Sequence, residues 1–137
     1  MTRFYISQII LALEHLHAND CIYRDLKPEN ILLEEDGYIK ITDFGLSKME
    51  VRNRNAQTLC GTNEYIPPEV LKREKYGKSY DWWSLGNLLY ELLVGKPPFY
   101  NENNKMVYDD ILSKEPDYPA YLTEDVIDLL KKLLNKD

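Results

Sequence analysis

The stretch Tyr23-Arg24-Asp25-Leu26-Lys27-Pro28-Glu29-Asn30, followed further along by Asp43-Phe44-Gly45, decides the interpretation of this chain. Pro28 excludes the first segment from regular strand pairing, so it is expected to form a loop. Residues 31–33 and 38–41 are strand candidates, and Asp36-Gly37 between them is a strong hairpin signal because glycine accepts positive φ. Such a hairpin would bring Asn30 and Asp43 together, since they lie just outside its two strands.

Asp25, Asn30 and Asp43 are residue types that suit phosphoryl transfer. This reaction requires magnesium held by oxygen ligands and a carboxylate that orients the attacking hydroxyl. Lys27 carries a compact positive charge that can neutralise a transferring phosphate. Taken singly, each aspartate could equally be a loop carboxylate bonded to a turn.

A third segment reads Thr58-Leu59-Cys60-Gly61-Thr62-Asn63-Glu64-Tyr65-Ile66-Pro67-Pro68-Glu69. Together, the three segments resemble the eukaryotic protein kinase family, whose catalytic loop H-R-D-x-x-x-x-N precedes D-F-G and A-P-E. Tyr23 in place of the usual histidine resembles the AGC-like group of serine/threonine kinases, which contains the cyclic-nucleotide-dependent kinases and protein kinase C. Asn63 and Pro67 depart from the family, which usually has proline and alanine at these positions.

The rest of the chain has mostly helical periodicity, over residues 4–17, 80–94, 102–113 and 123–134, whereas residues 43–69 have no clear period. The resemblance implies a mainly α fold: a protein-kinase-like C-terminal lobe with a small β-hairpin and no N-lobe. We therefore expect residues 1–137 to be a partial kinase domain, truncated at both ends. Truncation would leave Glu69 without the arginine that pairs with it in the family.

The resemblance implies a role for each motif residue. Asp25 would be the catalytic base, Lys27 would contact the γ-phosphate, and Thr62 would bond to both. Asn30 and Asp43 would be the Mg²⁺ ligands, and Asp81 would brace the backbone of the catalytic loop. Tyr23 and Phe44 would stack, and Leu32 would lie under the adenine ring. The residues expected to bind the cofactor ATP are Lys27, Glu29, Asn30, Leu32 and Asp43.

Thr58 matches the activation-loop phosphorylation site, which implies an upstream activating kinase as a partner. Arg24 is a planar donor fork suited to the added phosphate charge, although Thr58 could also remain unmodified. The resemblance implies a protein substrate that is phosphorylated at Ser/Thr. The residues expected to bind this substrate are Glu29, Glu91, Leu59 and Ile66. The two glutamates imply a preference for basic residues ahead of the target; alternatively, they are solvated acids.

Composition excludes several classes of protein. The net charge of −6 and the lack of a basic stripe argue against a nucleic-acid partner. The two cysteines lack metal-site spacing, which favours a reducing, intracellular and cytoplasmic setting. No apolar run is long enough for a membrane span. We expect the parent protein to phosphorylate proteins and this chain alone to be inactive; the alternative is a non-catalytic kinase lobe that serves as a binding or scaffold module.

Overall fold

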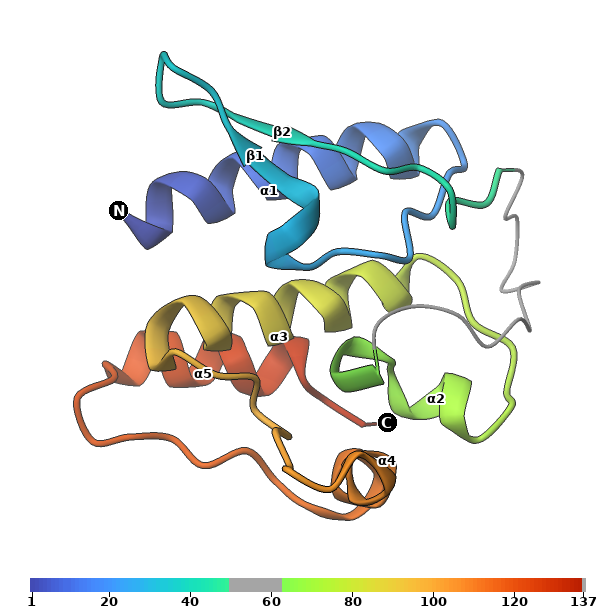
Figure 1. The fold of residues 1–137 in the computed structure, drawn as a ribbon, viewed down its shortest axis with the longest axis vertical. Coiled ribbons are helices and arrows are strands. Elements are labelled where there is room, and N and C mark those ends of the chain that lie inside the picture. The colour runs from blue at the N-terminus through green and yellow to red at the C-terminus, as the bar shows by residue number, and fades with distance from the viewer. Residues whose placement is uncertain (50–62, 137) are drawn as a thin grey trace.

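The computed structural model describes residues 1–49 and 63–136, and it confirms the mainly helical layout with one small hairpin (Figure 1). The elements are α1 (Thr2–Ala18), η1 (Pro28–Asn30), β1 (Ile31–Leu33), β2 (Ile39–Ile41), η2 (Asn63–Tyr65), α2 (Pro68–Leu71), α3 (Ser79–Val94), α4 (Asn104–Ser113) and α5 (Glu124–Leu133). Within these described ranges, no helix is both long and apolar enough to cross a bilayer.

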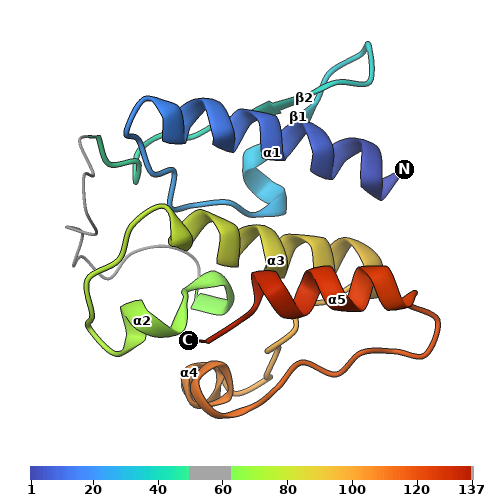
Figure 2. The same ribbon diagram turned by 180° about the vertical axis from the view of Figure 1, so that it is seen from behind.

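Helix α3 forms the centre of the molecule. It packs against α1 on one side and α5 on the other, as the two opposite views show (Figures 1 and 2). Leu85 and Leu88 on α3 belong to the same buried cluster as Ile9 and Leu13 on α1. Gly95 ends α3 in the left-handed conformation, with φ of 89°, as a helix-terminating glycine commonly does.

A glycine allows α3 and α5 to approach closely. A Cβ placed on Gly86 would lie 2.9 Å from Leu133 Cβ and 2.9 Å from Leu134 Cδ2. No side chain at position 86 could be accommodated without moving α5, because carbon atoms in contact normally lie about 3.5–4.0 Å apart. The spacing of these two helices therefore depends on this glycine.

The hairpin lies against α1 through one face only. β1 and β2 pair antiparallel with Ile31 opposite Ile41, and Gly37 in the connecting turn has φ of 85°. Ile31, Ile39 and Ile41 pack against the core, whereas Leu32 on the opposite face is 51% exposed. The hairpin thus carries an apolar surface that the described residues leave uncovered.

Two short elements occupy the stretch that shows no period in sequence. η2 and α2 belong to this stretch, and both contact α4. Ile66 and Val70 form a second buried cluster with Tyr76 and Tyr80. A helix of four residues is too short to show a period, which explains why sequence reasoning placed no helix there.

One local expectation needs adjustment. The Glu69 carboxylate, expected to lack a partner, accepts a hydrogen bond from Ser79 Oγ at 3.3 Å. This contact is exposed, so Glu69 is not a stranded buried charge.

Candidate functional site

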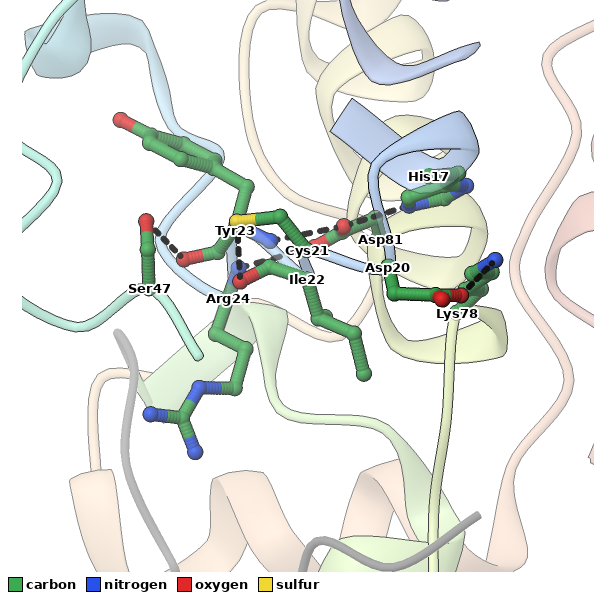
Figure 3. A network of polar contacts seen from close by, with 9 residues as sticks. All are labelled: His17, Asp20, Cys21, Ile22, Tyr23, Arg24, Ser47, Lys78 and Asp81. Carbon is green, nitrogen blue, oxygen red and sulfur yellow. Dashed lines mark hydrogen bonds and ion pairs between the residues drawn. The ribbon is translucent and has the colours of Figure 1, made fainter. Parts of the chain in front are cut away.

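The loop before Asp25 is fixed by one buried carboxylate (Figure 3). Asp81, at the start of α3, is 0% exposed. Its Oδ2 accepts from the Tyr23 amide at 2.9 Å, and its Oδ1 accepts from the Arg24 amide at 2.8 Å. His17 Nε2 lies 2.7 Å from Asp81 Oδ2. The predicted bracing role of Asp81 is confirmed, and α1 and α3 are joined to the loop at one point.

Arg24 adopts a strained backbone conformation inside this clamp. Its φ is 68°, a region that side chains other than glycine rarely adopt. The guanidinium is buried; Nε donates to the Leu46 carbonyl at 2.7 Å and Nη1 donates to the Tyr76 hydroxyl at 3.0 Å. These contacts, together with the Asp81 clamp, compensate for the strain and orient the following residue.

Asp25, Lys27 and Asn30 form one hydrogen-bonded group. Lys27 Nζ lies 2.9 Å from Asp25 Oδ2. The Asn30 amide nitrogen donates to the Asp25 backbone carbonyl at 2.9 Å and to its Oδ2 at 2.8 Å. The 3-10 turn η1 positions Asn30, and both Asp25 and Asn30 are buried. The sequence places all three on one loop, and the structure joins them by hydrogen bonds.

The hairpin brings Asp43 to the same place. The Thr42 amide donates to the Asn30 carbonyl at 2.9 Å, so Asp43 follows directly after a residue bonded to Asn30. Asp43 has φ of 57°, and its Oδ1 accepts from the Gly45 amide at 3.1 Å. The carboxylate itself is exposed.

Tyr23 lies beneath this group of polar residues. Its hydroxyl donates to the Thr42 carbonyl, and its ring meets Phe44 edge-on, with centroids 5.4 Å apart; the two rings touch, but they are not stacked in parallel. Burial raises the pKa of Tyr23 to about 12, and the charge of Asp25 acts in the same direction. The phenol therefore stays neutral and serves as a packed support.

The donor atoms fit a hydrated divalent cation with a nucleotide. Because the Asn30 nitrogen is committed to Asp25, the oxygen Oδ1 is the atom that Asn30 can offer to a metal. Asp43, one residue after the Thr42 that bonds to Asn30, offers an exposed carboxylate, and amide and carboxylate oxygens are the ligands that Mg²⁺ prefers. Leu32 offers an exposed apolar surface on the adjoining strand.

A second buried phenol, Tyr65, is bonded to a carboxylate. Tyr65 donates its hydroxyl to Glu91 Oε2. Burial is the main cause that raises the pKa of Tyr65, followed by the hydrogen bond to Glu91 and by the charges of Glu91, Glu29 and Glu64. Of the two predicted glutamates, Glu91 accepts this hydrogen bond, and the charge of Glu29 raises the pKa of the same phenol. Sequence reasoning did not select Glu64 or Tyr65, although both lie in the quoted third segment.

His17 was also missed. Sequence alone gave no partner for it, because Asp81 lies 64 positions further along the chain. Of the other expected site residues, Ile66 is 2% exposed and lies in the second buried cluster. Thr58, Leu59 and Thr62 lie outside the described residues, and their predicted roles stay predictions.

Comparisons with known proteins identify the family. The model of the protein kinase domain matches residues 1–137. The chain belongs to the protein kinase family. It is 52% identical, over its whole length, to "cAMP-dependent protein kinase type 3" of Saccharomyces cerevisiae and covers 34% of that protein. It is 50% identical over 137 residues to "Ribosomal protein S6 kinase beta" of Caenorhabditis elegans, with 99% of the chain and 25% of that protein covered.

These relatives confirm the resemblance to the AGC-like group of serine/threonine kinases. A third, the "cAMP-dependent protein kinase catalytic subunit" of Schizosaccharomyces pombe, is 49% identical over 137 residues, with 100% of this chain and 27% of that protein covered. The kinase chain spans about a third or less of the length of these relatives.

Proposed function

We propose that this chain is part of an ATP-dependent protein kinase that phosphorylates serine and threonine in proteins. The observation that carries the proposal is the group of Asp25, Lys27 and Asn30, joined by hydrogen bonds and placed beside Asp43 by the hairpin. Family membership and the identity to serine/threonine kinases support it.

In the proposed reaction, Asp25 accepts the hydrogen bond of the substrate hydroxyl and orients it for in-line attack. Its backbone is held by the Asp81 clamp and its carboxylate by Asn30, so its position is fixed before substrate binds. Bound ATP with Mg²⁺ supplies the phosphoryl group and offsets its charge. Asn30 Oδ1 and Asp43 would hold the metal, and Lys27 would neutralise the phosphate. Glu29 and Leu32 would complete the nucleotide side.

We further propose that the substrate carries basic residues ahead of its target. Glu29, Glu64 and Glu91 come from three elements and are close enough to act on one phenol. A carboxylate group of this kind matches the donor fork of an arginine. Ile66 is buried beneath the turn that would contact the peptide.

Phosphorylation of Thr58 by an upstream kinase would regulate the site. Arg24 has five N–H donors, and the two contacts at Leu46 and Tyr76 leave further donors on its guanidinium. A phosphate adds about −1.5 to −2 charge and would give this buried guanidinium a strong counter-ion.

The deciding experiment measures transfer of the γ-phosphate of ATP to a basic serine peptide by the longest natural protein that contains these residues. Asp25→Asn keeps an oxygen that can accept from Asn30, so the loop should fold, and the rate should fall by about 10²–10⁴. The matched control is Asp128→Asn, an exposed acid paired with Lys132. Equal transfer by the Asp25→Asn variant and its control would refute the proposal. We expect no detectable transfer from the 137-residue chain alone.

A further inference from the structure

A side-chain amide of α1 bonds to the hairpin. Gln8 Oε1 accepts from the Ile39 amide of β2 at 3.0 Å, across 31 positions of sequence. Gln8 Nε2 donates to the Phe4 carbonyl, one turn earlier in α1, at 3.4 Å. The two bonds fix the orientation of the side-chain amide, because its oxygen and its nitrogen face separate partners. Both views show the hairpin lying along α1 (Figures 1 and 2).

The Ile39 amide needs this partner because it points away from β1. The Glu34 amide donates to the Tyr38 carbonyl, and the Thr42 amide donates to the Asn30 carbonyl. In an antiparallel pair, bonded and unbonded residue pairs alternate along the strands. Ile39, one position after Tyr38, therefore belongs to an unbonded pair, and its N–H group is directed to the outer edge of β2. Gln8 satisfies a backbone donor that the hairpin itself cannot satisfy.

Strand β2 connects this contact to the candidate metal site. Thr42 follows β2 directly, and its amide and its Oγ1 donate to the Asn30 carbonyl at 2.9 and 3.2 Å. Asp43 is the next residue. Because β2 has only three residues, Asp43 follows Ile39 after about 13 Å of extended chain. A shift of β2 at Ile39 would therefore strain the bond between Thr42 and Asn30 and displace Asp43.

Other contacts hold the hairpin on α1 without Gln8. Ile39 and Ile41 pack against the core. The Phe4 ring meets the Tyr38 ring with centroids 6.0 Å apart, and both residues are about half exposed. Loss of the Gln8 bond should therefore shift β2 rather than unfold the hairpin, because the unpaired Ile39 amide would have to reach water.

We propose that Gln8 is a positioning residue for nucleotide binding: its bond to Ile39 holds β2 so that Asp43 and Asn30 can bind one Mg²⁺ ion together with ATP. This inference rests on the proposed kinase function. Gln8 lies on α1, outside the candidate metal site, and acts through β2. It should therefore affect the affinity for the magnesium–nucleotide complex and not the binding of the protein substrate.

The test replaces Gln8 in the longest natural protein that contains these residues. Gln8→Met keeps the length of the side chain and removes both polar atoms. Calorimetry with Mg²⁺ and the non-hydrolysable ATP analogue adenylyl imidodiphosphate should show an affinity weaker by about 2–10-fold, which corresponds to about 0.5–1.5 kcal/mol for one net hydrogen bond. With EDTA in place of Mg²⁺, the variant and the wild type should bind the analogue equally. In transfer assays, KM for Mg²⁺-ATP should rise by the same factor, with kcat and the peptide KM unchanged.

Three further variants test the proposed mechanism. Gln8→Glu keeps an oxygen for Ile39 and loses the donor to Phe4, so it should keep nucleotide affinity within about twofold of wild type. Ser7→Ala removes a hydroxyl on the same helix that donates to the same Phe4 carbonyl at 2.9 Å, and it should leave nucleotide affinity unchanged. In an Asp43→Asn background, Gln8→Met should cause no further Mg²⁺-dependent loss, because its effect acts through Asp43.

The outcomes distinguish this inference from the function on which it rests. If the wild-type protein transfers no phosphate to a basic serine peptide, the proposed function fails, and the inference fails with it. If the wild type transfers phosphate and Gln8→Met keeps its nucleotide affinity, or loses it equally with and without Mg²⁺, the function stands and the inference is wrong. A Gln8→Met protein that does not fold, or whose peptide KM also rises, would make Gln8 a general structural residue and would refute the inference.

Discussion

Replacing Asp81 with asparagine should loosen the loop that carries Asp25. The Asp81 carboxylate accepts from two backbone amides and contacts His17, with no exposure to solvent. Asparagine keeps one acceptor oxygen and puts an NH₂ donor group opposite the other amide. The variant therefore loses one charge-assisted hydrogen bond and leaves a buried N–H group unsatisfied.

The magnitude follows from these contacts. A hydrogen bond to a charged group contributes about 1.5–3 kcal/mol, and an unsatisfied buried donor costs about 1–3 kcal/mol. We expect Asp81→Asn to reduce the local free energy of opening by about 3 kcal/mol. That difference corresponds to roughly a hundredfold faster exchange of the Tyr23 and Arg24 amides.

Hydrogen exchange read by mass spectrometry on peptides that cover residues 21–27 measures this directly. Asp128→Asn, in an exposed pair on α5 with a 2.7 Å contact, should leave exchange unchanged. If the Asp81→Asn variant protects the Tyr23 and Arg24 amides as well as the wild type does, the clamp does not hold the loop and the reasoning is wrong.

Four further predictions concern the helix interface, the buried phenol, the acidic group and the phosphorylation site. Gly86→Ala should lower the free energy of unfolding by about 1–3 kcal/mol, measured by urea denaturation, because its Cβ would meet α5 at 2.9 Å. Burial raises the pKa of Tyr23 to about 12, so the contribution of its neutral phenol to stability is complete below pH 10 and should fall as pH rises from 10 to 12. In an alkaline titration of the free energy of unfolding, Tyr23→Phe should flatten that fall. Glu91→Lys should reduce kcat/KM for basic peptides more than for neutral ones. An equal loss for both would contradict the proposed binding of basic substrate residues by Glu29, Glu64 and Glu91. Thr58→Ala should reduce kinase activity in the full-length protein, and unchanged activity would exclude the proposed phosphorylation role.

The candidate catalytic residues could be predicted because their types and spacing are local. Asp25, Lys27 and Asn30 lie on one loop, and the Asp36-Gly37 turn was enough to bring Asp43 back to them. The resemblance also supplied Asp81, which the structure places as expected. The hairpin could be predicted from the residues of its turn, and the long helices from the periodic spacing of their apolar residues.

Contacts between distant segments could not be predicted in the same way. The pairing of His17 with Asp81 depends on how α1 packs on α3, and no pattern along α1 encodes it. The bond between Tyr108 and Asn63 joins two elements whose packing is set by the core. The four-residue helix α2 is too short to produce a period. In each case the information lies in tertiary packing, which a single sequence does not display.

The Asp81 clamp has a consequence for synthesis of the protein. The Tyr23 amide precedes its partner carboxylate by 58 positions, and the Arg24 amide precedes it by 57. At about 5–20 residues per second, the ribosome delivers Asp81 about 3–12 s after the loop has been made. During that interval Arg24 has no carboxylate to hold its strained backbone, and the apolar stripe of α1 has no α3 to cover it. The nascent chain therefore passes through a period of seconds in which chaperones can bind α1 and in which the loop cannot yet hold its final shape.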